Sequence, residues 1–164
     1  MIQNYQYIGF DFENKIVNYD DKKLMLQIWF NKTQDRFRTV TKTSYKGSNG
    51  ILLLYSVEVK SSYDFIANAI KSIEANKKEE MVIILVGNKS HLETRIISEE
   101  KGKELADKYG YPFFECSTEN KSEVKEVFEY MAKEIYKWIK EGKMKDPLIR
   151  IKKETGKEKK GCAK

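Results

Sequence analysis

Two nearly continuous apolar runs limit what this chain of 164 residues can fold into. They span 51–57 and 81–86 and read Ile-Leu-Leu-Leu-Tyr-Ser-Val and Met-Val-Ile-Ile-Leu-Val. Short runs of this kind are typical of strands that are buried on both faces of a parallel sheet. Apolar residues recur at helical spacing after the first run (63–76), and a helix to Tyr109 is indicated after the second. The sequence therefore predicts an α/β fold with a mostly parallel sheet covered on both faces.

The other elements follow from shorter signals. Apolar positions within 8–19 and 23–30 predict two strands joined by a turn at Asp20-Asp21, and the pair is expected to form an antiparallel hairpin. Ser98 can cap the helix that runs to Tyr109, and Gly110 can end it. A short strand is expected at 112–116. One long amphipathic helix with apolar residues from Val124 to Ile139 should complete the domain.

Charge separates the chain into a domain and a tail. The net charge is +6, and the segment 141–164 holds nine Lys/Arg against four Asp/Glu, which leaves +1 on residues 1–140. A nearly neutral body argues against a nucleic-acid-binding face, whereas a basic flexible tail suits solvent or peripheral contact with a membrane surface. Cys116 and Cys162 provide neither a disulfide framework nor metal-ligand spacing, which favours a reducing, cytoplasmic compartment.

Seven short motifs occur in the order in which Rab-family small GTPases carry them. The segments are 8–12, 26–29, 36–41, 45–48, 54–57, 86–92 and 115–120, which resemble I-G-V-D-F, L-Q-I-W, R-F-R-S-I-T, Y-R-G-A, V-Y-D-I, V-G-N-K-C-D-L and E-T-S-A-K-N. The resemblance covers nearly all of residues 7–140. It implies a P-loop-NTPase-like G domain with GTP or GDP and Mg²⁺ as cofactors. It also implies a role in vesicle traffic at the cytosolic face of endomembranes.

The phosphate loop of that family is not found. No stretch of the sequence matches G-x-x-x-x-G-K-[S/T], whose amides and lysine hold the nucleotide phosphates. In the family this loop, with the first strand and the first helix, precedes the I-G-V-D-F segment, which begins here at Ile8. We therefore expect a G domain that is incomplete at its N-terminus and lacks the first strand, the phosphate loop and the first helix.

The missing strand also raises a problem for the sheet. In the G-domain order it lies between the strands expected at 23–30 and 51–57, so its loss leaves a gap of roughly 9–10 Å. Buried strand edges with unpaired backbone groups are costly. Three explanations are open: the chain lacks its first segment, the sheet closes or borrows a strand from a partner, or the isolated chain is poorly stable. We favour the first, because the rest of the sequence is patterned for a full sheet.

The positions that hold Mg²⁺ and the γ-phosphate in the family are altered. Tyr7 stands where the family has the metal-binding threonine, Phe30 replaces a metal-supporting aspartate, and Thr33 replaces a glycine. We therefore expect no metal ligands. Gln34 matches the glutamine that positions the attacking water and is the catalytic candidate, but it has no phosphate to act on. The alternative, which we favour, is a solvated loop residue.

The base-reading positions are only partly kept. Asn88 and Lys89 match the family, whereas His91 replaces the aspartate that accepts two hydrogen bonds from guanine, and an imidazole has at most one acceptor nitrogen. Leaving that base edge partly unpaired costs roughly 1–3 kcal/mol. The alternative is that these residues only shape loops. The nucleotide-binding candidates are Asn88, Lys89, His91, Ser117, Thr118 and Glu119, of which Glu119 replaces a family lysine.

Partner contacts are also implied by the resemblance. Rab proteins bind effectors and regulators through a Phe-Trp-Tyr cluster; Phe12 and Trp29 match its first two members, and Ser44 stands at the third. The alternative is that these aromatic residues pack on the sheet. The effector-binding candidates are Ile8, Phe12, Trp29, Arg36, Phe37 and Tyr45.

Rab tails end in prenylated cysteines, and Cys162 stands third from the end of this sequence, one residue short of the C-a-a-X motif. A lipid on Cys162 together with the basic tail would form a two-signal membrane anchor. The alternative, which we slightly favour, is an unmodified exposed cysteine.

Three functions follow from the sequence. The first is a Rab-like protein of vesicle traffic whose GTP binding and hydrolysis are weak or absent. The second is an ordinary GTP-binding Rab protein whose first segment is missing from this sequence. The third is a protein-interaction module that works without nucleotide, through Phe12, Trp29 and the loop 36–45.

Overall fold

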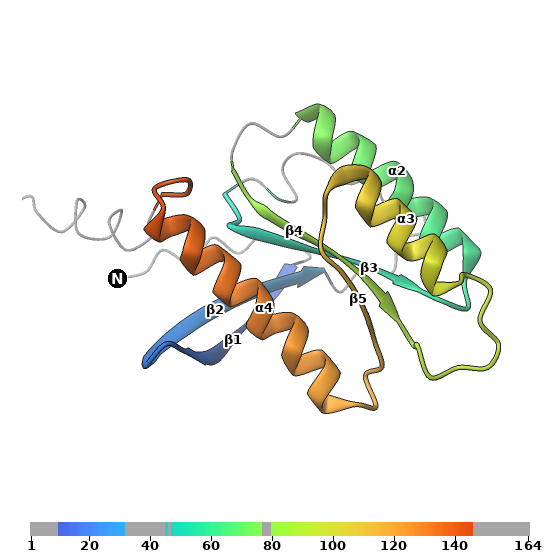
Figure 1. Ribbon diagram of the computed structural model, residues 1–164, viewed down its shortest axis with the longest axis horizontal. Coiled ribbons are helices and arrows are strands. Elements are labelled where there is room, and N and C mark those ends of the chain that lie inside the picture. Colours follow the sequence, from blue (N-terminus) through green and yellow to red (C-terminus); the bar gives the residue numbers. More distant parts are fainter. Residues whose placement is uncertain (1–9, 32–44, 46, 77–79, 146–164) are drawn as a thin grey trace, which may run out of the picture.

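The computed structural model describes residues 10–31, 45, 47–76 and 80–145. In chain order the elements are β1 (Phe10–Tyr19), β2 (Lys22–Asn31), β3 (Gly50–Ser56), α2 (Lys60–Asn76), β4 (Val82–Asn88), α3 (Glu99–Tyr109), β5 (Phe113–Cys116) and α4 (Lys121–Lys140) (Figure 1). Every element expected from the sequence within these residues is present. The α/β class is confirmed.

The strands form two sheets rather than one. β1 and β2 make an antiparallel hairpin, and β3, β4 and β5 make a parallel sheet in that order. The predicted turn is confirmed: Asp20 and Asp21 have φ angles of 51° and 55° between the paired residues Tyr19 and Lys22. Two consecutive left-handed residues give the turn whose twist matches that of the flanking strands.

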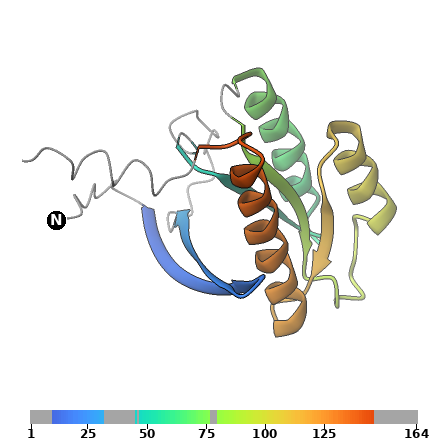
Figure 2. The same ribbon diagram turned by 60° about the vertical axis from the view of Figure 1, so that its left-hand side comes forward.

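β4 is the central strand of the parallel sheet, and its side chains alternate between two cores. Ile83 and Leu85 lie in the core with the apolar residues of α2 and α3, whereas Val82, Ile84 and Val86 lie in the core beneath α4. Figure 2 shows α4 on one side of the sheet and α2 and α3 on the other. This arrangement explains why the sequence of β4 is apolar throughout, as strands covered on both faces require.

The helix ends are set by local chemistry. The Ser98 side chain accepts a hydrogen bond from the Lys101 N–H, and Gly110 ends α3 with a φ of 67°, as predicted. α2 begins at Lys60, earlier than its apolar pattern indicated. Its first turn is polar and is fixed by an ion pair between Lys60 and Asp64. The first turn of α4 is also polar, and Asn120 caps it.

β2 and β3 are not paired with each other among the described residues. α4 contacts both sheets: it packs on β1 of the hairpin and on β4 and β5 of the parallel sheet. The half-exposed Leu54 of β3 is unusual for a strand with so apolar a sequence. Among the described residues the two sheets therefore meet through α4.

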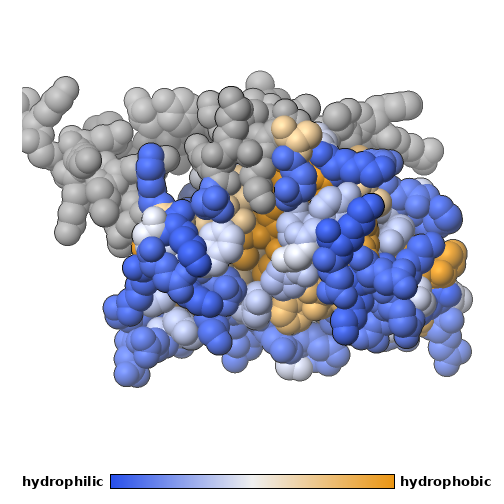
Figure 3. Space-filling view, turned by 45° about the horizontal axis from the view of Figure 1, so that its top comes forward, coloured by the Kyte–Doolittle hydropathy of each residue, from blue (hydrophilic) through white to orange (hydrophobic). Residues whose placement is uncertain are grey.

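Hydrophilic side chains cover most of the face in Figure 3, with a strip of apolar side chains between them. In the part of the chain that the structure describes, no helix is both long and apolar enough to cross a membrane. Several sequence candidates lie outside the described residues. These are Tyr7, Ile8, Thr33, Gln34, Arg36, Phe37, Ser44 and Cys162, together with the tail from 146 onward.

Candidate functional site

The base-reading candidates come together where β4 and β5 end. Asn88 pairs with Cys116 across these adjacent parallel strands, so the loop after Asn88 meets the loop after Cys116. The Ser90 N–H donates to the Cys116 carbonyl at 3.3 Å, which joins the two loops directly. Ligands of open α/β sheets bind at this carboxyl edge. The topology therefore places the candidates of both loops in one region.

His91 is held between two residues of the β5–α4 loop. Its Nδ1 lies 2.7 Å from Ser117 Oγ, and its Nε2 lies 3.5 Å from Glu119 Oε1. Ser117 Oγ also accepts the Glu119 N–H at 3.1 Å. Both ring nitrogens of His91 therefore face protein groups, Nδ1 the Ser117 hydroxyl and Nε2 the Glu119 carboxylate.

Both nitrogens that His91 could offer to a base lie against protein groups of this network. Ser117 is buried, whereas the His91 and Glu119 side chains are 34% and 78% exposed. In either neutral tautomer the imidazole has one acceptor nitrogen, whereas the aspartate that the family has at this position accepts two N–H groups of guanine.

Lys89 is also held by the protein itself. It adopts a left-handed conformation with a φ of 65°, and its ammonium pairs with the Glu58 carboxylate. The Asn88 side-chain oxygen accepts the Lys89 N–H at 2.8 Å. The two residues that match the family here thus make contacts within the loop and to the β3–α2 connection.

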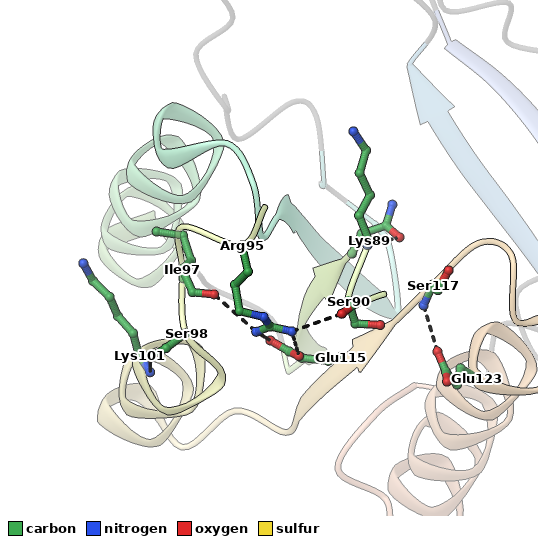
Figure 4. A network of polar contacts seen from close by, with 10 residues as sticks. Lys89, Ser90, Arg95, Ile97, Ser98, Lys101, Glu115, Ser117 and Glu123 are labelled. Carbon is green, nitrogen blue, oxygen red and sulfur yellow. Dashed lines mark hydrogen bonds and ion pairs between the residues drawn. The ribbon is translucent and has the colours of Figure 1, made fainter. Parts of the chain in front are cut away.

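Arg95 clamps the loop after β4 to β5. Its guanidinium makes two hydrogen bonds to the Glu115 carboxylate, at 2.7 and 2.6 Å, and it donates to the carbonyls of Ile97 and Ser90. Figure 4 shows this fan of contacts beside Lys89. Because Arg95 donates these hydrogen bonds to the Glu115 carboxylate, its pKa is raised above the usual value. A bidentate pair of this kind fixes geometry as well as charge.

The loop that carries Ser117 is fixed to α4 by a second carboxylate. Glu123 accepts the Ser117 N–H at 2.8 Å through Oε2, and it accepts the Asn120 side-chain amide at 2.6 Å through Oε1. The Ser117–Glu123 contact is visible in Figure 4. Because Glu123 lies in the first turn of α4, its charge also suits the positive end of the helix dipole.

Four residues of the site were not found from the sequence: Glu58, Arg95, Glu115 and Glu123. Three of them act through partners distant in sequence: Glu58 and Lys89 are separated by 31 positions, and Arg95 and Glu115 by 20. The partners of Glu123, Ser117 and Asn120, are six and three positions away. No local pattern predicts such pairs, because charged residues at these spacings are common on any surface. Only the N-cap region around Asn120 carried a local signal.

Two of the effector-binding candidates, Phe12 and Trp29, lie on the surface, whereas Tyr45 is buried. The Phe12 and Trp29 rings lie opposite each other on the hairpin, with centroids 5.0 Å apart, and both side chains are nearly half exposed. Trp29 Nε1 donates to Gln27 at 3.2 Å. Tyr45 was expected on the same surface, but it is only 7% exposed and packs in the core with the residues of β3 and α2. The physical reason is that the Tyr45 ring is removed from water when it packs against apolar side chains.

Three of the described residues differ from the cofactor contacts that the resemblance implies. Both ring nitrogens of His91 face Ser117 and Glu119, Lys89 is paired with Glu58, and Phe30 has no oxygen for a metal. Within residues 10–31, 45, 47–76 and 80–145 no group of His, Cys, Asp and Glu side chains could hold a metal ion. Thr118 is exposed beside Ser117, where its backbone amide remains a candidate donor. We derive no hydrolytic step for this chain.

Comparison with protein families gives the class. Residues 2–137 match the family model described as "Ras family". The chain therefore belongs to the Ras family of small GTPases, in agreement with the parallel sheet and the loops at its carboxyl edge.

Individual relatives refine this assignment. The chain is 39% identical over 137 residues to Ras-related protein SEC4 of Saccharomyces cerevisiae, which covers 84% of this chain and 64% of that protein. It is 41% identical over 140 residues to Ras-related protein RABE1e of Arabidopsis thaliana, with the same coverage. Ras-related protein Rab-8B of Dictyostelium discoideum is 40% identical over 131 residues, 79% of this chain and 64% of its own length. Within the Ras family the chain is thus a Rab protein, and it spans less than two thirds of the length of these relatives.

Proposed function

We propose that this chain acts in intracellular vesicle traffic as a Rab-family protein that holds guanine nucleotide weakly or not at all and does not hydrolyse GTP. The observation that carries the proposal is the closed network of Ser117, His91 and Glu119 at the carboxyl edge of β4 and β5. The Lys89–Glu58 pair supports it, since the ammonium of Lys89 is engaged by a carboxylate of the protein itself.

Calorimetry with GDP and with GTP in the presence of Mg²⁺ tests this proposal. We expect no binding tighter than about 100 μM, because no described residue replaces the acceptor for guanine. Removing one such acceptor alone costs about tenfold or more. A His91→Asp variant measures how much of the loss arises at this position, and Lys103→Gln on the far helix is the control. Micromolar or tighter binding by the unaltered chain would refute the proposal.

A second candidate is favoured by the coverage of the relatives. Since the chain spans 64% of the SEC4 and RABE1e proteins, an ordinary GTP-binding Rab protein with an upstream segment is the alternative. Upstream coding sequence with G-x-x-x-x-G-K-[S/T] would support it. The domain of residues 1–140 would then be a G domain completed by that segment, with GTP or GDP and Mg²⁺ as its cofactors and Gln34 as its catalytic residue.

A third candidate is a nucleotide-independent module that binds Rab-type effectors or regulators. The exposed Phe12–Trp29 pair supports it, because large aromatic side chains are frequent binding hot spots. The other expected contacts of this surface, Ile8, Arg36 and Phe37, remain proposals.

Binding of a purified effector or exchange factor of a Rab relative should fall roughly thirtyfold in Trp29→Ala, since hot-spot truncations cost about 2 kcal/mol or more. The affinity should not change when GTP is added. Met25→Ala is the matched control, because Met25 is also exposed on β2. An equal loss in both variants, or a requirement for GTP, would count against this module.

The tail 141–164 is proposed to contact the cytosolic face of an endomembrane through its basic residues. A lipid on Cys162 would add a second anchor. Mass measurement of the protein from a eukaryotic host would detect the prenyl group.

A further inference from the structure

A hollow of about 250 Å³ lies between the hairpin turn and the C-terminal end of α4. None of the residues that line it belongs to the two base-reading loops. It is lined by Tyr19, Asp20, Tyr136, Lys137, Lys140 and Glu141. The Tyr19 and Tyr136 rings meet edge to face with centroids 6.0 Å apart, so they join β1 to α4 at this point.

Lysines of β2 and α4 contact these two tyrosines. Lys22 of β2 donates to the Tyr136 hydroxyl at 2.7 Å, and the Lys140 ammonium lies 5.1 Å from the centre of the same ring. The Lys133 ammonium lies 6.0 Å from the Tyr19 ring. These positions suit cation–π attraction. The hydrogen bond from Lys22 also lowers the pKa of Tyr136, as a positive environment should.

The charges here are unbalanced. The hollow is lined by Lys137 and Lys140 against Asp20 and Glu141, and the two tyrosines add Lys22 and Lys133, so four lysines face two carboxylates with a net charge of +2. One carboxylate is already engaged, because Glu141 pairs with Lys143 at 2.8 Å. Lys22, Lys133, Lys137 and Lys140 are all exposed. An anionic surface could therefore approach them without rearranging the core.

The basic tail begins at the same place. α4 ends at Lys140, and the following residues 141–164 carry the excess of five positive charges. We propose that the hairpin turn and the end of α4, with Lys22, Lys133, Lys137 and Lys140, dock on an anionic lipid bilayer and contact its phosphate headgroups. This proposal extends the membrane contact proposed for the tail to the folded domain, and it does not depend on nucleotide binding.

Vesicle binding of the 164-residue chain tests the docking surface. Phosphatidylcholine vesicles with and without phosphatidylserine are compared by co-sedimentation, for the unaltered chain and for Lys133→Gln/Lys137→Gln/Lys140→Gln. Each lysine near an anionic leaflet contributes about fivefold to binding, so the triple variant should lose roughly tenfold to a hundredfold. The matched control is Lys103→Gln/Lys108→Gln/Lys121→Gln, which removes the same charge from α3 and from the start of α4.

The outcomes separate the tail from the docking surface. Equal losses in the two triple variants would overturn the docking surface and leave the tail as the contact. Absence of binding by the unaltered chain would overturn both. Binding that inorganic phosphate abolishes at constant ionic strength would show that a free phosphate is the ligand. If the triple variant does not fold, Lys22→Gln on the hairpin decides, with an expected loss of about fivefold against no loss for Lys103→Gln.

Discussion

Arg95→Ala should lower the free energy of unfolding by about 3 kcal/mol, measured by urea denaturation. The reason is that the variant leaves the Glu115 carboxylate, whose side chain is 11% exposed, without its bidentate partner. Breaking a buried pair costs more than the pair itself contributes, since one charge then stays unpaired. The carbonyls of Ser90 and Ile97 lose a donor as well.

Lys60→Ala is the matched control for this prediction. The Lys60–Asp64 pair has similar chemistry, but both side chains are more than half exposed, so its loss should cost at most about 0.5 kcal/mol. Similar losses for the two variants would mean that the Arg95 clamp does not stabilise the domain. The double variant Arg95→Ala/Glu115→Leu should recover part of the loss, because the unpaired charge is removed.

Ile84→Ala should cost about 3–4 kcal/mol in the same measurement. Ile84 has no exposed surface and lies at the centre of β4, the strand that has a neighbour on each side and helices on both faces. Truncation removes buried methyl groups and leaves a cavity that the surrounding strands and α4 cannot close fully.

The control for Ile84 is Ile96→Ala, which removes the same atoms from a side chain that is 62% exposed. Its cost should stay below about 1 kcal/mol. A small effect at Ile84 would mean that the core beneath α4 repacks easily, and a comparably large effect at Ile96 would contradict its exposed position.

Local patterns were sufficient to predict most of the fold. The apolar runs at 51–57 and 81–86 identified β3 and β4. β4 is buried on both faces, which leaves little room for polar residues, whereas β3 is only partly buried and Leu54 is half exposed. The cap at Ser98, the stop at Gly110 and the turn at Asp20 could be predicted because each depends on a few neighbouring residues. The start of α2 was placed late, because its first turn is polar and carries no periodic signal.

The candidate site was less predictable. His91 and Ser117 were named as nucleotide-binding candidates only through the family resemblance, and their direct contact depends on the pairing of β4 with β5 in the folded chain. The ion-pair partners Glu58 and Arg95 could not be predicted, because pairs distant in sequence depend on side-chain positions that only the folded chain defines. The burial of Tyr45 was missed for a related reason: a tyrosine beside Gly47 in a polar segment gives no sign of which core it enters.

The separation of the two sheets has a consequence for local stability. The described contacts that tie the hairpin to the rest of the domain run mainly through α4, whereas β4 is held by strands on both edges. Elements with few cooperative contacts can open without unfolding the whole protein. The hairpin should therefore behave as a unit of lower stability than the three-stranded sheet, and its amide hydrogens should exchange with solvent sooner than those of β4.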